Sequence, residues 1–96
     1  MNNEKLIYQQ IGDIARKYDT DKVVLFGSRS RKTNDWKSDI DLAIYGCKHF
    51  RDLYFDINEN VDTLLTFDII NMDRNDISSL LIKEIERDGI IIYEKI

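Results

Sequence analysis

Helical and strand periodicities alternate along this chain, and that alternation constrains its fold more than any other feature. Apolar residues recur at helical spacing from Ile7 to Tyr18. The run Val23–Phe26 is β-branched and apolar, and Gly27 closes it. The first pattern is typical of an amphipathic helix, and the second of a buried strand that ends in a tight turn.

The same alternation continues to the last residues. After a polar stretch from 28 to 38, the sequence predicts strands over 39–44, 65–70 and 90–93 and helices over 50–64 and 77–85. Asp76 or Asn75 can cap the start of the last helix, and Gly89 suits its C-terminal cap. With a short helix after Gly27, this order predicts an α/β (α+β) fold with helices packed on a small sheet.

Size and composition favour one globular domain over residues 1–96. The chain has 96 residues, of which 43% are hydrophobic and 33% charged, and it contains no proline or flexible linker. Cys47 is the single cysteine, which excludes an intrachain disulfide and suits a reducing compartment. No stretch approaches the roughly 20 apolar residues of a membrane span. We therefore expect a cytoplasmic protein.

The charge balance limits the possible partners. Fourteen basic and 18 acidic residues give a net charge of -4, which disfavours bulk nucleic-acid binding. One local basic cluster contains Arg29, Arg31 and Lys32, with Lys37 nearby. Its expected target is a few phosphate groups.

The segment Asp39-Ile40-Asp41 places two carboxylates two residues apart on a predicted strand, so both project from one face. Like charges so placed repel unless a cation offsets them, and Mg²⁺ prefers oxygen ligands. A lone Asp-x-Asp is more often a solvated strand entrance. Here Asp68 lies within the apolar run 64–70, where an unpaired buried charge would cost several kcal/mol.

Three aspartates on neighbouring strands could hold two metal ions for an in-line phosphoryl displacement. Asp39, Asp41 and Asp68 are therefore the candidate catalytic and metal-binding residues. Asp62 lies near a helix end and Asp73 in a turn, and for both we expect solvation or capping.

Gly27 and Ser28 are candidates for holding phosphates. Gly27 would let a phosphate approach the backbone, Ser28 could donate its hydroxyl, and Arg29 could add a fixed charge. The alternatives are a plain turn with a serine N-cap and a solvated Arg29. Trp36 is expected to cover the sheet edge, with stacking on a base as the alternative.

The combined motif resembles a known superfamily. Gly27-Ser28, ten further residues and then Asp39-Ile40-Asp41 match the signature of the DNA polymerase beta-like nucleotidyltransferases. Residues 26–31 and 38–43 resemble the minimal nucleotidyltransferase (MNT) antitoxins that are encoded beside HEPN-domain toxins, and Asp68 falls where their third carboxylate is expected. Lys32 departs from the usual small residue, commonly glycine, and Ser30 from a common alanine.

The resemblance implies a mixed sheet, Mg²⁺ and ATP as cofactor and substrate, and transfer of AMP to a tyrosine of the partner toxin. A non-catalytic antitoxin that acts by binding, and transfer to a small molecule or RNA, are the alternatives. Apolar residues outside the expected buried stripes (Phe55, Ile82 and the run 90–92) favour a protein partner, with a homodimer as the competing explanation.

Overall fold

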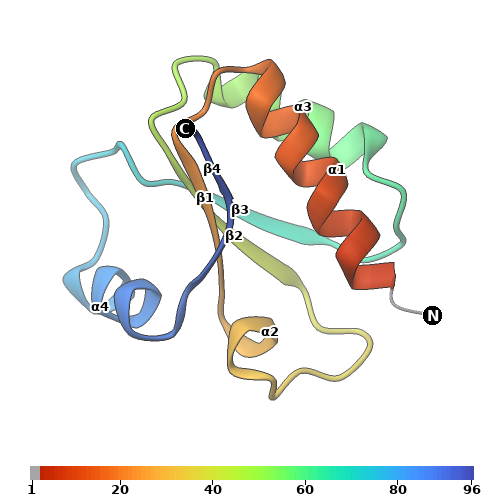
Figure 1. The fold of residues 1–96 in the computed structure, drawn as a ribbon. Coiled ribbons are helices and arrows are strands. Elements are labelled where there is room, and N and C mark those ends of the chain that lie inside the picture. Colours follow the sequence, from red (N-terminus) through yellow and green to blue (C-terminus); the bar gives the residue numbers. More distant parts are fainter. Residues whose placement is uncertain (1–2) are drawn as a thin grey trace.

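Four strands form one mixed sheet in the order β3-β2-β1-β4 (Figure 1). The computed structural model describes residues 3–96, so residues 1 and 2 of the expected domain lie outside it. The strands are β1 (Lys22–Phe26), β2 (Ile40–Tyr45), β3 (Phe67–Asn71) and β4 (Ile90–Glu94). β1 pairs antiparallel with β2 and β4, and β2 pairs parallel with β3. The mixed sheet expected from the family resemblance is confirmed.

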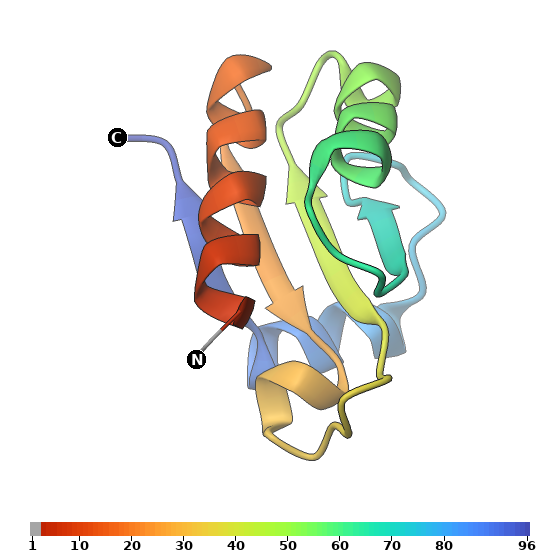
Figure 2. The same ribbon diagram turned by 90° about the vertical axis from the view of Figure 1, so that its right-hand side faces the viewer.

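Helices cover both faces of this sheet (Figures 1 and 2). α1 (Asn3–Lys17) and α3 (Phe50–Asn60) lie on one face, and α4 (Ser79–Asp88) lies on the other. The short α2 (Ser28–Arg31) follows β1 at one end of the sheet. Within residues 3–96, no helix has the length and apolar character needed to cross a membrane.

Alternation along the strands divides the core into two layers. Ile40, Leu42 and Ile44 of β2 pack with α1 and α3, whereas Ala43 packs with Ile85 of α4. Because neighbouring strand residues face opposite ways, Asp41 must lie on the α4 face, beside the smaller core. The hydrophobic pattern thus places Asp41, the charged residue of β2, on the less completely covered face of the sheet.

The second long helix is shorter than its apolar pattern predicts. α3 ends at Asn60, because its C-cap residue Val61 is extended (φ -74°, ψ 127°). Val61 is still buried, but Leu64 is fully exposed and lies outside the helix. Asp62 is exposed, as expected, and its N–H donates to Oε1 of Gln10 at 3.1 Å.

The last helix also begins later than expected. Its N-cap is Ser78, whose Oγ accepts the Leu80 N–H at 3.2 Å, so the prediction of Asp76 or Asn75 as the cap is wrong. Gly89 is the C-cap, as predicted, although its backbone is extended. A Cβ there would lie 2.3 Å from the Ile85 carbonyl oxygen, so close approach is what favours glycine.

β4 is an edge strand with apolar residues on both faces. Ile90 and Ile91 are exposed, while Ile92 and Tyr93 both pack on the core of α1 and α3. The ladder shifts register between Val23 and Val24, and this irregularity lets two consecutive residues face one layer. Of the other residues expected off the buried stripes, Phe55 is exposed and Ile82 is half-buried.

Candidate functional site

The three predicted aspartates come together at the end of the sheet nearest α2. Asp39 immediately precedes β2, and Asp41 within β2 is the register partner of Asp68 in β3. Paired residues on parallel neighbours project from the same face. Asp39 and Asp68 are exposed and Asp41 is half-buried, so the carboxylates meet at an open surface.

Negative charge is concentrated around Asp41. Burial and then the negative charges of Asp68, Asp39 and Glu84 of α4 together raise the pKa of Asp41 to about 6. Arg31 acts in the opposite sense. No sequence pattern pointed to Glu84, since only the packing of α4 against β1 brings this helix to the site.

The burial expected for Asp68 is wrong, although its placement beside Asp41 is as predicted. Asp68 lies on β3, an edge strand, and its side chain is exposed. The apolar run around Asp68 therefore belongs to an edge strand, one face of which is partly exposed to solvent. Next to it, the Thr66 hydroxyl donates to Oδ1 of Asp39 and links the first carboxylate to the β3 side of the site.

Gly27 is packed directly under the Asp41 carboxylate. Its φ is 76°, in the region that glycine adopts readily, and a Cβ at this position would lie 2.1 Å from Oδ2 of Asp41. Gly27 is also the N-cap of α2, and no side chain caps that helix, so the alternative of a serine N-cap is wrong. Ser28 is half-buried at the first helical position.

Among residues 4–96, Arg29 is the one charged residue that is buried, with 4% of its surface exposed. Its Nε and Nη2 donate to the Ser38 carbonyl oxygen at 3.1 and 2.8 Å, and Nη2 also reaches the Trp36 carbonyl oxygen at 3.4 Å. Nη1 pairs with Oε1 of Glu4 at 2.9 Å. The solvated alternative is wrong, and the phosphate contact stays a prediction.

The other basic residues of the cluster are exposed. Nη1 of Arg31 lies 3.9 Å from Oε1 of Glu84, at the margin of the aspartates. Lys32 has a φ of 63°, which explains why glycine would suit this position. Trp36 is 77% exposed, so the prediction that it covers the sheet edge is wrong.

The donor set fits a divalent oxygen-preferring cation. Asp39, Asp41 and Asp68 supply carboxylate oxygens from two adjacent strands, the ligand type that Mg²⁺ takes. Across residues 3–96, no three His, Cys, Asp or Glu side chains are gathered into a ready-made ligand cluster. Mutual repulsion opposes such gathering without a cation. The three carboxylates therefore have the ligand chemistry that Mg²⁺ prefers, but they are not arranged as a complete set of metal ligands.

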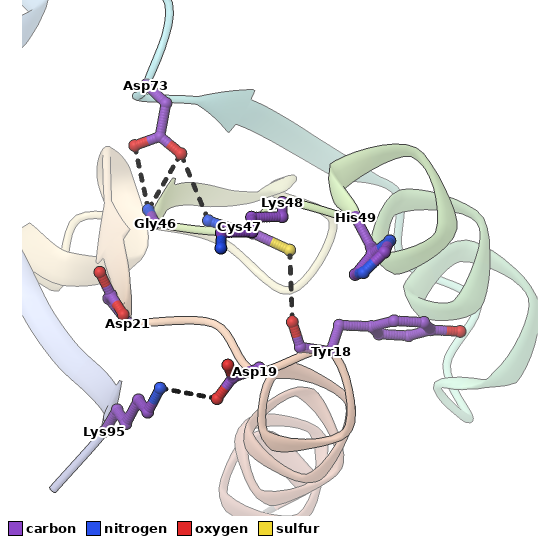
Figure 3. A pocket seen from close by; sticks show the side chains of 9 residues that line it. All are labelled: Tyr18, Asp19, Asp21, Gly46, Cys47, Lys48, His49, Asp73 and Lys95. Atoms are coloured by element: carbon purple, nitrogen blue, oxygen red, sulfur yellow. Dashed lines mark hydrogen bonds and ion pairs between the residues drawn. The ribbon is translucent and has the colours of Figure 1, made fainter.

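A different polar cavity lies at the far end of the sheet (Figure 3). It has a volume of about 410 Å³ and is lined by Tyr18, Asp19, Asp21, Gly46, Cys47, Lys48, His49, Asp73 and Lys95. Both oxygens of Asp73 accept the Gly46 N–H at 3.0 Å, and one accepts the Cys47 N–H at 3.3 Å. Asp73 therefore caps a loop, as expected, and Cys47 is buried beside it.

A small mixed sheet that carries aspartates on adjacent strands beside a glycine turn defines a nucleotidyltransferase type of fold. The sequence model of the family described as Polymerase beta, Nucleotidyltransferase matches residues 9–96. The chain belongs to this family.

Solved structures share the fold over nearly the whole chain. One is described as a toxin-antitoxin with AMP-PNP, with 20% identity, a TM-score of 0.67 and coverage of 99% of this chain and 75% of that one. Another is a mutant of the toxin-antitoxin MntA-HpeT, with 19% identity, a TM-score of 0.66 and the same coverage. No curated protein sequence is significantly similar to the chain.

Proposed function

We propose that this protein is a Mg²⁺-dependent nucleotidyltransferase that moves AMP from ATP to a tyrosine hydroxyl of a partner HEPN-domain toxin, and so acts as a cytoplasmic antitoxin. The observation that carries the proposal is the meeting of Asp39, Asp41 and Asp68 beside the Gly27 turn in a chain of this family. The likeness to structures described as toxin-antitoxin complexes supports the choice of partner.

In the proposed reaction, the acceptor oxygen bonds to the α-phosphorus of ATP. The bond from that phosphorus to the oxygen bridging to the β-phosphorus breaks, and pyrophosphate leaves. A carboxylate oxygen of Asp68, which is exposed to an incoming acceptor, receives the hydroxyl proton. Asp39, Asp41 and Asp68 would hold Mg²⁺, which would offset the phosphate charge and favour the ionised nucleophile.

Gly27 and Ser28 orient the triphosphate in this proposal. Because Gly27 has no Cβ, both the Asp41 carboxylate and a phosphate can approach the same backbone. The Ser28 hydroxyl donates to a phosphate oxygen. The exposed position of the carboxylates leaves room for an acceptor that arrives on another protein.

The proposal is tested by co-expressing the chain with the product of the neighbouring gene, which the proposal expects to be a HEPN-domain protein, then measuring size-exclusion behaviour and the intact mass of that product. Purified proteins are next incubated with ATP labelled at the α-phosphate, with and without Mg²⁺, using the wild type and Asp41→Asn. We expect a Mg²⁺-dependent gain of AMP on the partner that the variant does not produce. A complex without any mass gain would instead indicate an antitoxin that acts by binding, and no complex and no labelling would contradict the proposal.

A further inference from the structure

Arg29 connects three segments that are distant in the sequence. Its guanidinium group binds the carbonyl oxygens of Trp36 and Ser38 on one side and the carboxylate of Glu4 on the other. Tyr8 donates its hydroxyl to the second oxygen of Glu4 at 3.1 Å. The side chain of Arg29 is 2% exposed, so a rigid fork of donors is locked between α1 and the loop that leads into β2.

The anchored carbonyl belongs to the residue immediately before Asp39. Ser38 accepts two of the donors of Arg29, and the peptide bond that carries this carbonyl ends at the Asp39 nitrogen. One residue later, the Ile40 N–H donates to the Thr66 carbonyl oxygen at 3.0 Å. The backbone of Asp39 is therefore held from both sides, by Arg29 before it and by the strand ladder after it.

The same bonds argue against a direct phosphate contact. A buried guanidinium that already donates to two carbonyls and a carboxylate has most of its five donors occupied. Releasing it toward a ligand would break the hydrogen bonds to the Trp36 and Ser38 carbonyl oxygens and the ion pair with Glu4, which is costly. Arg31, two residues on, is exposed and unlike Arg29 free of such an enclosure.

We infer that Arg29 is a positioning residue, which fixes the first metal-binding aspartate by clamping the Ser38 carbonyl oxygen, and that Glu4 and Tyr8 of α1 hold Arg29 in place. The inference rests on the proposed function only in assigning Asp39 to the metal. It makes α1 part of the support of the site, through Glu4 and Tyr8. Groups that orient metal ligands in this indirect way typically contribute 10-fold to 100-fold to metal affinity.

The test measures Mn²⁺ binding to the nucleotide-free protein by electron paramagnetic resonance, so it requires neither acceptor nor turnover. Arg29→Lys keeps the charge but not the fork, and Arg29→Gln removes both. We expect each to raise the Kd for Mn²⁺ at least about 10-fold. Arg31→Gln is the matched control, because it also removes one positive charge near the aspartates. The Arg31→Gln substitution should lower the Kd for Mn²⁺ or leave it unchanged, whereas the Arg29 substitutions should raise it.

A role confined to stability would lower the Tm of the Arg29 variants and leave their Mn²⁺ affinity at the wild-type value, which would overturn the inference. A phosphate contact would instead raise the KM for ATP at saturating Mg²⁺, whereas a positioning role raises the Mg²⁺ requirement and is rescued by excess metal. Where an Arg29 variant does not fold, Glu4→Gln carries the test, with a smaller rise in Kd for Mn²⁺ expected.

Amide hydrogen exchange supplies a readout without metal. Loosening the Ser38 anchor should speed exchange of the Ile40 N–H at least about 10-fold relative to the Val24 and Leu25 amides of β1. If the wild type does not bind Mn²⁺ but exchange of the Ile40 N–H still depends on Arg29, the proposed metal site is contradicted. The positioning of the Asp39 backbone by Arg29 is then still supported. Wild-type exchange at Ile40 in Arg29→Lys, with wild-type Mn²⁺ affinity, would refute the positioning role.

Discussion

Aspartates cluster at both ends of the sheet, but the groups that surround them differ in charge and in hydrogen-bonding capacity. At the end near α2, the charges closest to Asp41 are mostly negative, with Asp68, Asp39 and Glu84 outweighing Arg31. At the far end, the chain supplies donors to its own carboxylates. Asp73 accepts backbone N–H groups, and Asp19 pairs with Lys95 at 2.7 Å.

The difference supports our proposal that the α2 end is the ligand site. Carboxylates that already accept donors from the chain gain less from an added cation, even where they line a cavity of about 410 Å³ (Figure 3). Carboxylates that crowd one another leave a favourable interaction for a cation to make. The balance of charge around each carboxylate, and not the size of the nearest cavity, is therefore what favours the α2 end in our proposal.

The largest effect is expected from Asp41→Asn. The substitution removes one ligand charge and no core volume, so nucleotidyl transfer should fall at least about 100-fold. Because it also relieves repulsion from Asp39 and Asp68, the free protein should have a higher Tm than the wild type at pH 7 in EDTA. Transfer of labelled AMP and differential scanning fluorimetry measure the two effects.

Asp73→Ala is the matched control at the far end. It should keep nucleotidyl transfer near the wild-type rate but lower the free energy of unfolding by about 1 kcal/mol, since the Gly46 and Cys47 N–H groups lose their acceptor. The comparison would break if both substitutions changed stability in the same direction.

A second pair of substitutions compares the two glycines with positive φ. Gly27 and Gly46 have φ values of 76° and 65°, and a Cβ on either would lie 2.1 Å from a carboxylate oxygen, of Asp41 or Asp21 respectively. We expect Gly27→Ala and Gly46→Ala each to lower the free energy of unfolding by about 1–3 kcal/mol.

Only Gly27→Ala should also weaken ATP binding, which isothermal titration calorimetry of the folded variants measures. Equal ATP affinity in the two variants would remove the phosphate-holding role from the Gly27 turn while leaving its steric role intact.

The two ends should also titrate on opposite sides of the ordinary aspartate pKa of 3.8. Burial and then the Asp68 charge raise the pKa of Asp41 to about 6, whereas the hydrogen bond from Lys95 lowers the pKa of Asp19. The ionised Asp41 therefore disfavours the fold, and this penalty appears as the pH rises from 3.8 through about 6. Asp19 contributes stability above pH 3.8 that is lost as the pH falls through its lowered pKa.

Carboxyl-carbon NMR titration of the metal-free protein measures both groups. Lys95→Met is the control, and it should return the Asp19 pKa toward its ordinary value without moving that of Asp41. Matching pKa values for Asp41 and Asp19 in the wild type would contradict the comparison.

Local patterns predicted the fold well, because it depends on short-range features, and the role of the three aspartates stays a prediction. The alternation of β2 directed Asp41 to one face of the sheet, and the apolar run around Asp68 located β3. The exposure of individual side chains and the contacts between distant segments depend on tertiary packing, which local patterns do not predict. Asp68 is exposed because β3 is an edge strand, and Glu84 joins the site because α4 packs across β1. Arg29 is buried through carbonyl partners that no spacing rule reveals.

The smallest effect is expected at two residues other than glycine, the ones within residues 3–96 that have positive φ. Lys32 ends α2 at φ 63°, and Asp19 follows α1 at φ 54°. A long side chain is disfavoured there, so Lys32→Gly should raise the free energy of unfolding by about 0.5–1 kcal/mol. Aspartate tolerates this region better, and Asp19 also holds Lys95, so Asp19→Gly should yield a smaller gain or a loss.

Urea denaturation of both variants tests the pair. Lys32→Gly should also leave AMP transfer unchanged within about two-fold, since the substitution removes no carboxylate and leaves the turn at Gly27 in place. A gain at Asp19 as large as at Lys32 would show that the Lys95 ion pair adds nothing at the far end, and would weaken the contrast on which the assignment of that end as structural rests.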